Sequence, residues 1–501
     1  MKITFDAKSS PRTDAFVVFA AEGGKLLEPG KWIDKKTEGA LKRAIAAEKF
    51  EAKKAQALVV TGPAGTTHAH IVVLGVGKPE ELKAKDFEKL GSDLVGVLNR
   101  HKAASAEMAF CTEGLKMKGI SCEKACAGMA LGALLNSYRF DKYLTKEPKD
   151  KKPTLKSLHF TTEAPAATRA LFAQSRKTAE AVFLTRNLVS EPPNVIYPES
   201  FADIIKKELS PLGIKVTVLG KKEIIAQGMG ALMAVGQGSA REPKLVTMEY
   251  RGGAKGDKNI AFVGKGVTFD TGGISIKPSA NMDEMKWDMA GAGAVTGLMK
   301  ALAERKAKAN VVGVVALAEN MPSGEACRPG DIVTSMSGQT VEILNTDAEG
   351  RLILCDALWY CQEKFKPTHI VDLATLTGAV IIALGHEYAA VFSNDNDFAK
   401  HLIHAGKETG EELWRLPLSD AWDKELDSPA ADIKNIGAGR GAGSAIGAHF
   451  LKRFIKDGVK WAHLDIAGVA WSDKPRTSVP KGASAFGVRL LDRYVAEYGE
   501  K

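Results

Sequence analysis

Apolar residues along the chain fall into two patterns: short uninterrupted runs, and longer segments in which they recur every three or four positions. The runs predict buried strands and the spaced segments predict helices. From residue 191 onward, the predicted strands are 215–219, 245–250, 259–263, 309–317, 369–373 and 461–466, and the predicted helices are 201–209, 290–305, 352–365, 444–456 and 484–498. Because strands and helices alternate, we expect an α/β fold with a doubly wound, mixed sheet.

The first 165 residues predict a second, smaller α/β domain. Its expected strands are 15–20, 57–60 and 70–74, and its expected helices are 80–100 and 122–139. Residues 166–188 have helical periodicity, and Pro192-Pro193 ends that segment. We therefore expect an N-terminal α/β domain over 1–165, a linker helix over 166–190 and a larger C-terminal domain over 191–501.

Composition adds few constraints. Of the 501 residues, 45% are hydrophobic and 26% are charged, which is typical of an ordinary soluble protein. The first residues lack the apolar core of a signal peptide, and no apolar run reaches the roughly 18 residues that span a membrane. The six cysteines show no disulfide spacing, so we expect reduced thiols. A cytoplasmic protein with no membrane partner is the resulting prediction.

One heptapeptide, Asn345-Thr-Asp-Ala-Glu-Gly-Arg351, places two carboxylates and an arginine just before a predicted helix. Asp347 and Glu349 are two positions apart, so an extended backbone would point both carboxylates the same way. Arg351 stands where the helix begins, and the free N–H groups of a helix start favour an anion. Thr346 and Glu349 also have the spacing of a helix capping box, which would be a purely structural role.

A second segment, 264–288, carries two further carboxylates and two lysines in apolar and glycine-rich surroundings. The predicted strand 259–263 leads into Lys265 and Asp270, and ligands gather at such strand ends in α/β sheets. Residues 274–277 alternate in polarity, which predicts a short strand with Lys277 on its polar face. Asp288 precedes a helix start rich in small residues, where an N-cap is the structural alternative.

Four carboxylates without a histidine predict an oxygen-rich metal site. Such ligands suit Mn²⁺, Mg²⁺ or Zn²⁺. Three or more acids exceed what one ion needs, so we expect two ions about 3.5–4 Å apart, with bridging carboxylates and a bridging hydroxide. A lysine could join as a ligand only when neutral, which neighbouring cations favour by lowering its pKa. A second, charged lysine could polarise a carbonyl oxygen.

These residues resemble the leucyl aminopeptidases, also called cytosol aminopeptidases. The heptapeptide 345–351 matches the family signature, and Lys265, Asp270, Lys277 and Asp288 fall at the family's spacing. Further matching segments are 187–194, 320–324, 328–331, 374–378 and 461–468. The likeness covers the C-terminal two thirds of the chain. It implies a catalytic domain that hydrolyses the N-terminal peptide bond and releases leucine and other residues from peptides with a free N-terminus.

The resemblance also implies a role for each residue of the metal site. One ion would be held by Asp270, Asp347 and Glu349, and the other by Lys265, Asp270, Asp288 and Glu349. The expected ions are two per subunit, Mn²⁺ or Zn²⁺, with Mg²⁺ as an alternative. Lys277 would be the electrophile that stabilises the tetrahedral oxyanion, and Arg351 would hold a bicarbonate that acts as general base.

The substrate pocket and the assembly follow from the same resemblance. The implied substrate-binding residues are Met285, Asn345, Thr375, Leu376 and Gly378. Ala470 stands where some relatives have methionine, which predicts a roomier pocket for the first side chain. The family implies a homohexamer with active sites that face its interior.

Rival functions make different demands on the sequence. A P-loop nucleotide site would need a glycine where Asn259 stands and a Ser or Thr in place of Gly266. A serine hydrolase would need Gly-x-Ser-x-Gly, which is absent. A two-metal phosphoesterase could use the same acids, but the expected pocket has no arginine clamp beyond Arg351. The net charge of +9 leaves nucleic-acid binding open, although the excess is small for this length and spread along the chain.

Overall fold

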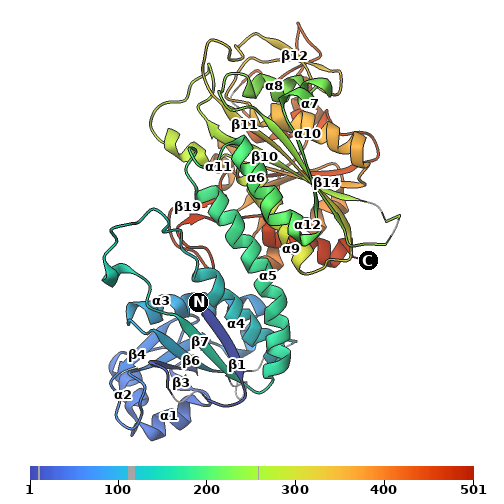
Figure 1. Cartoon of the computed structure of the whole chain (residues 1–501). Helices are drawn as coiled ribbons and strands as arrows, with labels where there is room; N and C mark the ends of the chain where they lie inside the picture. The colour runs from blue at the N-terminus through green and yellow to red at the C-terminus, as the bar shows by residue number, and fades with distance from the viewer. Residues whose placement is uncertain are drawn as a thin grey trace. The chain divides into compact units, whose positions relative to one another are not determined.

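The computed structural model describes the whole chain except residues 10, 11, 111–114, 116–118, 255, 258, 440 and 501. The chain forms two units (Figure 1): Met1–Ala179 with Lys474–Pro480, and Glu180–Asp473 with Lys481–Lys501. A helix is present where the linker helix is predicted, as α5 (Pro165–Ser190). Cys111 lies outside the described residues, and the five described cysteines form no disulfide with one another. In the described part of the chain, no helix is both long and apolar enough to cross a membrane.

The first unit contains a seven-stranded sheet in the order β1-β7-β6-β2-β5-β4, with β3 beside β2. Its strands are β1 (Lys2–Asp6), β2 (Ala15–Ala21), β3 (Lys25–Leu26), β4 (Ala57–Thr61), β5 (His70–Gly77), β6 (Ser105–Phe110) and β7 (Ser157–Thr162), and its main helices are α1 (Gly30–Lys36), α2 (Ala40–Ala47), α3 (Ala84–Arg100) and α4 (Cys122–Asn136). Alternate residues of β2 face opposite sides. Val18 shares a core with Ile33 of α1, whereas Phe19 contacts Phe110, which in turn contacts Phe87 of α3. Helices therefore cover both faces of this sheet.

The second unit contains an eight-stranded sheet in the order β16-β15-β18-β14-β10-β11-β9-β8. Its strands are β8 (Lys215–Leu219), β9 (Lys244–Arg251), β10 (Ile260–Asp270), β11 (Asn310–Asn320), β14 (His369–Ala374), β15 (Ala389–Ser393), β16 (Leu413–Arg415) and β18 (Lys460–Asp465). The four central strands β11, β10, β14 and β18 are parallel, whereas β9 and β15 run antiparallel to their central neighbours. This mixed sheet confirms the predicted fold class.

Helices cover both faces of the larger sheet. Its helices are α6 (Pro198–Leu209), α7 (Lys221–Ala226), α8 (Gly230–Gly236), α9 (Ala290–Glu304), α10 (Gly350–Phe365), α11 (Gly378–Leu384), α12 (Asn396–Thr409), α13 (Asp420–Lys424), α14 (Gly443–Lys452) and α15 (Val488–Tyr494). Ala261 and Val263 of β10 share a core with residues of α8, α10 and α14. Gly264, on the opposite side of β10, meets α9 at Ala292. The smaller strands are β12 (Ile332–Thr334), β13 (Thr340–Glu342), β17 (Ile433–Lys434), β19 (Trp471–Ser472) and β20 (Gly482–Ala483).

Three of the differences between the predicted elements and the structure follow. The short strand predicted over 274–277 is wrong, because these residues form a loop in which the backbone N–H of Ser275 bonds to the Thr346 hydroxyl instead of to a strand. The helix predicted over 80–100 begins at Ala84, after a short 3₁₀ turn. The helix predicted from 484 begins only at Val488, because Gly487 has a left-handed φ of 101° that no helix continues through.

The close approach of α9 to β10 generates a stability prediction. A Cβ atom built on Gly264 would lie 2.7 Å from both Ala292 Cα and the Gly291 carbonyl oxygen. We expect Gly264→Ala to lower the free energy of unfolding by about 1–3 kcal/mol, because the helix must move away from the sheet. Chemical denaturation measures this value. Gly324→Ala is the control, since nothing lies within 4 Å of its built Cβ; an equal loss in both variants would contradict the explanation.

Candidate active site

The polar groups of the site lie at the carboxyl ends of the four central parallel strands. β10 ends at Asp270, β11 at Asn320, β14 just before Thr375, and β18 at Asp465. The carboxyl ends of parallel strands meet at one edge of a sheet, where ligands bind in open α/β folds. Residues far apart in the sequence are therefore neighbours here.

An irregularity in β10 puts two of the predicted ligands on the same side of the strand. Lys265 and Asp270 are five positions apart, so a regular strand would point them to opposite faces. The pairing of β10 with β11 shifts register between Val267 and Phe269. Such a bulge re-aims the side chains beyond it. As a result, Lys265 and Asp270 line the same cavity.

The loop before α10 brings in the two remaining acids, Asp347 and Glu349. The capping-box interpretation of this loop is wrong: α10 begins at Gly350 without a side-chain cap. The hydroxyl of Thr346 instead donates to the Gly272 carbonyl oxygen over 2.6 Å. It also accepts from the Ser275 N–H over 2.8 Å. Thr346 therefore joins the two loops that carry the predicted metal ligands.

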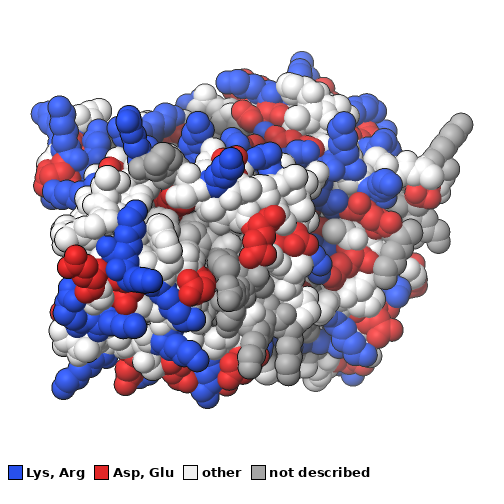
Figure 2. All heavy atoms as spheres, turned by 90° about the horizontal axis from the view of Figure 1, so that it is seen from below, with Lys and Arg blue, Asp and Glu red and all other residues white. Residues whose placement is uncertain are grey.

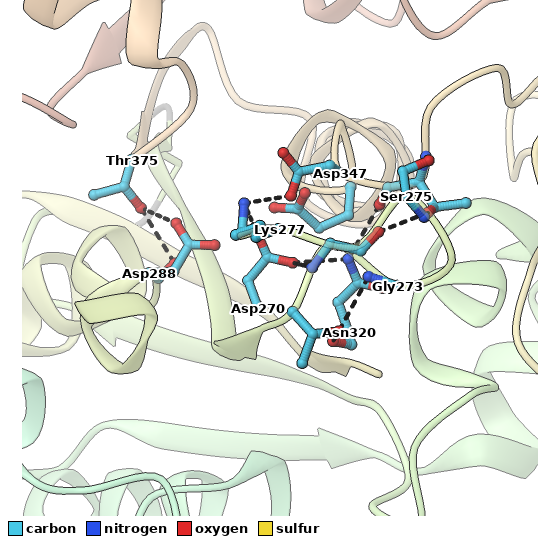
Figure 3. Close-up of polar contacts among 12 residues, drawn as sticks. Asp270, Gly273, Ser275, Lys277, Asp288, Asn320, Asp347 and Thr375 are labelled. Carbon is cyan, nitrogen blue, oxygen red and sulfur yellow. Dashed lines mark hydrogen bonds and ion pairs between the residues drawn. The ribbon is translucent and has the colours of Figure 1, made fainter. Parts of the chain in front are cut away.

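Two lysines lie among the four carboxylates. Figure 3 shows one of them, Lys277, between Asp270 and Asp347. The Lys265 ammonium is 2.8 Å from an oxygen of Asp288 and 2.8 Å from an oxygen of Glu349. Its third N–H donates to the Thr375 carbonyl oxygen over 2.8 Å. The Lys277 ammonium is 2.7 Å from Asp270 Oδ2 and also pairs with Asp347.

The N-cap interpretation of Asp288 is also wrong. The N-cap of α9 is Met289, which makes no side-chain cap. Asp288 Oδ1 instead accepts a hydrogen bond of 2.6 Å from the Thr375 hydroxyl, beside its ion pair with Lys265. Thr375 thus holds both members of this pair, one with its hydroxyl and one with its carbonyl.

The chemistry of the cluster fits a divalent cation. One oxygen from each of Asp270, Asp347 and Glu349 lies within 4.8 Å of the others. Asp288 Oδ2 and Glu349 Oε2 are buried and accept no hydrogen bond from the protein. A buried carboxylate oxygen without a donor is costly, and a metal ion is a partner that satisfies it.

The protein's own positive charges do not fully stabilise the ionised form of the acids. Burial and the neighbouring Asp270 raise the pKa of Glu349 to about 8. Burial, acting against Lys265, raises the pKa of Asp288 to about 6. Burial alone would lower the pKa of Lys265, but the surrounding carboxylates of Asp288, Glu349 and Asp270 raise it instead. Lys265 is thus an ammonium when only the acids surround it.

The cluster opens into a cavity of about 440 Å³. The residues that line this cavity include all five predicted metal ligands, which are Lys265, Asp270, Asp288, Asp347 and Glu349. They also include Lys277 and four of the five residues predicted to contact substrate, which are Met285, Thr375, Leu376 and Gly378. Asn345, the fifth, is not among the lining residues. Its side-chain oxygen accepts from the Asp347 N–H over 2.9 Å. Ala470 is buried outside the lining, whereas its neighbour Trp471 lines the cavity and stacks on Trp287.

Arg351 lies behind Glu349 in the first turn of α10 and does not line this cavity. Its guanidinium donates to the Asn435 carbonyl oxygen over 2.7 Å, while its Nε is buried without a hydrogen-bond partner. Burial lowers the pKa of Arg351 to about 10, against the opposing effect of Glu349 and Asp465. Arg351 remains charged at neutral pH.

The sequence analysis missed three polar residues that hold the site together. Asn320 bonds to Asp270, and Asn435 bonds to the backbone of the 344–348 loop. Asp465 accepts from the Leu376 N–H and the Thr377 hydroxyl, and so fixes the loop after β14. Asn320 and Asp465 could have been found from their positions at the carboxyl ends of parallel strands. No comparable signal marks Asn435.

Comparison with known proteins identifies the family. Residues 183–492 match the model for the catalytic domain of the cytosol aminopeptidase family, and residues 17–147 match the model for its N-terminal domain. The chain belongs to the cytosol aminopeptidase family. It is a metallopeptidase of the leucyl aminopeptidase type, as the sequence predicted.

Individual relatives are similar over nearly the whole chain. A probable cytosol aminopeptidase of Caulobacter vibrioides is 50% identical over 97% of this chain and 96% of its own length. Among solved structures, a mutant of tomato leucine aminopeptidase has a TM-score of 0.87 at 32% identity and covers 99% of this chain and 96% of its own. The bottromycin maturation enzyme BotP in complex with Mn has a TM-score of 0.84 at 32% identity and covers 97% of this chain and 100% of its own.

The raised pKa of Glu349 predicts how the stability of the metal-stripped protein depends on pH. Its folded-state value of about 8 lies above its ordinary value of 4.5, so between these pH values the folded protein binds more protons than the unfolded chain. The protonated Glu349 carboxyl therefore favours the folded state, and the free energy of unfolding falls as pH rises toward 8 and the carboxyl ionises. We expect Glu349→Gln to flatten the fall in melting temperature between pH 5 and 8. Glu408→Gln, at an exposed position, is the control; an unchanged pH profile in Glu349→Gln would refute the assignment.

Proposed function

We propose that this aminopeptidase uses two divalent metal ions to remove N-terminal residues, leucine-like ones among them, from peptides with a free amino group. The observation that carries the proposal is the convergence of Asp270, Asp288, Asp347 and Glu349 on one cavity, with Lys265 and Lys277 among them. Two oxygens of this cluster are buried without a protein donor. Divalent cations in addition to the lysines would stabilise an assembly of this kind.

The proposed ligand sets divide the cluster. Asp270, Asp347 and Glu349 would hold one ion, and their oxygens already lie within 4.8 Å of one another. Lys265, Asp270, Asp288 and Glu349 would hold the other. Mn²⁺ or Zn²⁺ is the proposed metal, with Mg²⁺ as an alternative; the similar BotP structure is a complex with Mn. When bound, the ions would supply a hydroxide nucleophile at neutral pH.

Lys265 would serve as a ligand only as a neutral amine. The acids around it raise its pKa, and two divalent cations would act in the opposite direction. Its side chain is almost fully buried and reaches no solvent. The amine therefore has no alternative to the groups of the cluster.

Lys277 would remain charged and act on the substrate carbonyl. Its loop position leaves its side chain 21% exposed to the cavity, unlike the 3% of Lys265. The Asp270 and Asp347 carboxylates favour its ammonium form. A fixed ammonium beside the reacting carbonyl would stabilise the negative charge that develops on its oxygen.

Arg351 would hold a bicarbonate anion that provides the general base. Its Nε has no protein partner, and it stands in the first turn of a 16-residue helix whose N-terminal dipole favours anions. The Asn435 carbonyl fixes the other side of the guanidinium. Met285, Thr375, Leu376 and Gly378 would bind the substrate from the cavity wall, and Asn345 would contact it from the loop before Asp347.

Peptide hydrolysis is preferred to phosphate-ester hydrolysis because the residues proposed to bind the substrate are uncharged. Met285, Leu376 and Gly378 carry no phosphate-binding group. Assays on leucine amide and on a phosphate monoester would separate the two. Leucine amide hydrolysis without phosphatase activity supports the proposal, and the reverse result would overturn it.

The remaining proposals concern partners and location. A homohexamer and a cytoplasmic location are proposed on the family membership and on the name that the relatives carry. Nucleic-acid binding is not favoured: on the face shown in Figure 2, basic and acidic side chains are intermingled over the described surface. If the protein also bound duplex DNA, that binding would weaken steeply as the salt concentration rises.

The role of Lys277 gives a direct test. We expect Lys277→Ala to lower kcat about 10²- to 10³-fold or more, because one electrostatic contact to the transition state is lost. Metal content by elemental analysis should stay at the wild-type value. Lys300→Ala, on α9 and paired with Glu304, is the matched control. Loss of metal from Lys277→Ala would mean that this lysine belongs to the ligand set instead.

Metal removal gives a second test. A chelator should abolish activity, and Mn²⁺ or Zn²⁺ should restore it with about two ions bound per subunit, since the cluster offers more carboxylates than one ion needs. Elemental analysis and leucine amide hydrolysis are measured on the same samples. Full activity with a single ion per subunit would contradict the two-metal arrangement.

A further inference from the structure

The side chain of Asn320 lies between the two loops that carry the proposed metal ligands (Figure 3). Its Nδ2 is 2.8 Å from Oδ1 of Asp270, the last residue of β10 before the first of these loops. The same nitrogen is 3.0 Å from the Thr346 carbonyl oxygen, next to Asp347 in the second loop. An amide nitrogen has two hydrogens, so each hydrogen serves one loop.

The orientation of this amide is fixed by its surroundings. Reversing it would place the carbonyl oxygen of Asn320 against two other acceptors, Asp270 Oδ1 and the Thr346 carbonyl. Its backbone is held as well, because its carbonyl oxygen accepts from the N–H and the hydroxyl of Thr271 over 3.0 and 2.8 Å. Asn320 is only 4% exposed, so its two hydrogen bonds are shielded from bulk water.

The contact with Asn320 determines which oxygen Asp270 presents to the cluster. Oδ1 accepts from Asn320 and from the Gly272 N–H over 2.8 and 2.9 Å. The other oxygen of Asp270, Oδ2, points at the Lys277 ammonium and is the one presented to the cluster of acids. Without Asn320, Oδ1 would keep only the Gly272 N–H, and the ion pair of Oδ2 with Lys277 would be the other contact that holds the carboxylate.

We propose that Asn320 is a positioning residue that fixes the Asp270 carboxylate and thereby sets the affinity of the cluster for divalent cations. The proposal deepens the proposed function and rests on it, because it takes Asp270 as a metal ligand. Hydrogen bonds that orient a ligating carboxylate are typically worth 10- to 100-fold in metal affinity.

A role limited to joining the two loops is a weaker explanation. Thr346 already joins them through its hydroxyl, which bonds to Gly272 and Ser275. The Ser275 hydroxyl accepts in return from the Thr346 N–H over 3.1 Å. These bonds remain when Asn320 is replaced, so the loss would fall mainly on Asp270.

The test is a titration of the full chain with Mn²⁺ after chelator treatment, followed by calorimetry. Asn320→Ala removes both donors, and Asn320→Leu removes them while it keeps most of the volume. We expect both variants to bind Mn²⁺ about 10- to 100-fold more weakly than the wild type, because Asp270 belongs to both proposed ligand sets. Comparable losses in the two variants would assign the effect to the donors rather than to a cavity.

Asn310→Ala is the matched control. Asn310 begins the same strand that Asn320 ends, is 6% exposed, and also donates from its Nδ2 to two carbonyl oxygens, those of Ala254 and Asp257. We expect this variant to melt at a lower temperature and to bind Mn²⁺ with wild-type affinity. Equal weakening in Asn310→Ala, or wild-type affinity in both Asn320 variants, would overturn the proposal. A wild-type protein that binds no Mn²⁺ would instead defeat the proposed function itself.

Discussion

Mutual repulsion among buried carboxylates is the constraint on which the larger unit depends. Each lysine of the cleft is shared by two acids: Lys265 by Asp288 and Glu349, and Lys277 by Asp270 and Asp347. Taking a charged group out of water costs on the order of several kcal/mol even after relaxation. The pKa of about 8 for Glu349 shows that two ammonium groups do not offset this cost completely. The unfavourable energy that remains is what divalent cations would relieve, so the strain among the acids and the affinity for metal have one origin.

The fold supplies this cluster from rigid elements. Lys265 lies inside the central strand β10 rather than on a loop, and the register shift beyond it turns Asp270 to the same side. A Cβ built on Gly350 would lie 2.7 Å from the Lys265 side chain, so the start of α10 can approach the strand only as glycine. Close packing of backbone against the lysine stem excludes water from the ammonium. That exclusion strengthens every charge interaction in the cleft.

The parts that the sequence predicted well are those in which local pattern and burial agree. β2 and β10 are apolar runs buried on both faces, and both were expected. β7 was missed because Ser157–Thr162 is mostly polar and buries only alternate residues. The acids and lysines of the site were predicted because charges in apolar surroundings are unusual. Asn435 carries no charge and differs from ordinary loop residues only in its partners, which are more than 80 positions away and visible only after folding.

Burial lowers the pKa of both Lys265 and Arg351, but the two side chains differ in whether they can lose a proton, and this difference explains why they are not interchangeable. Arg351 keeps its charge at neutral pH even though burial lowers its pKa to about 10. It is therefore suited to holding an anion permanently. Lys265 is an ammonium beside carboxylates alone, yet a primary amine can lose its proton when divalent cations raise the local positive charge. An arginine at position 265 could not make that change, because a guanidinium does not deprotonate in proteins. The proposed chemistry of the cleft would thus need the lysine within the strand and the arginine at the helix start, and not the reverse.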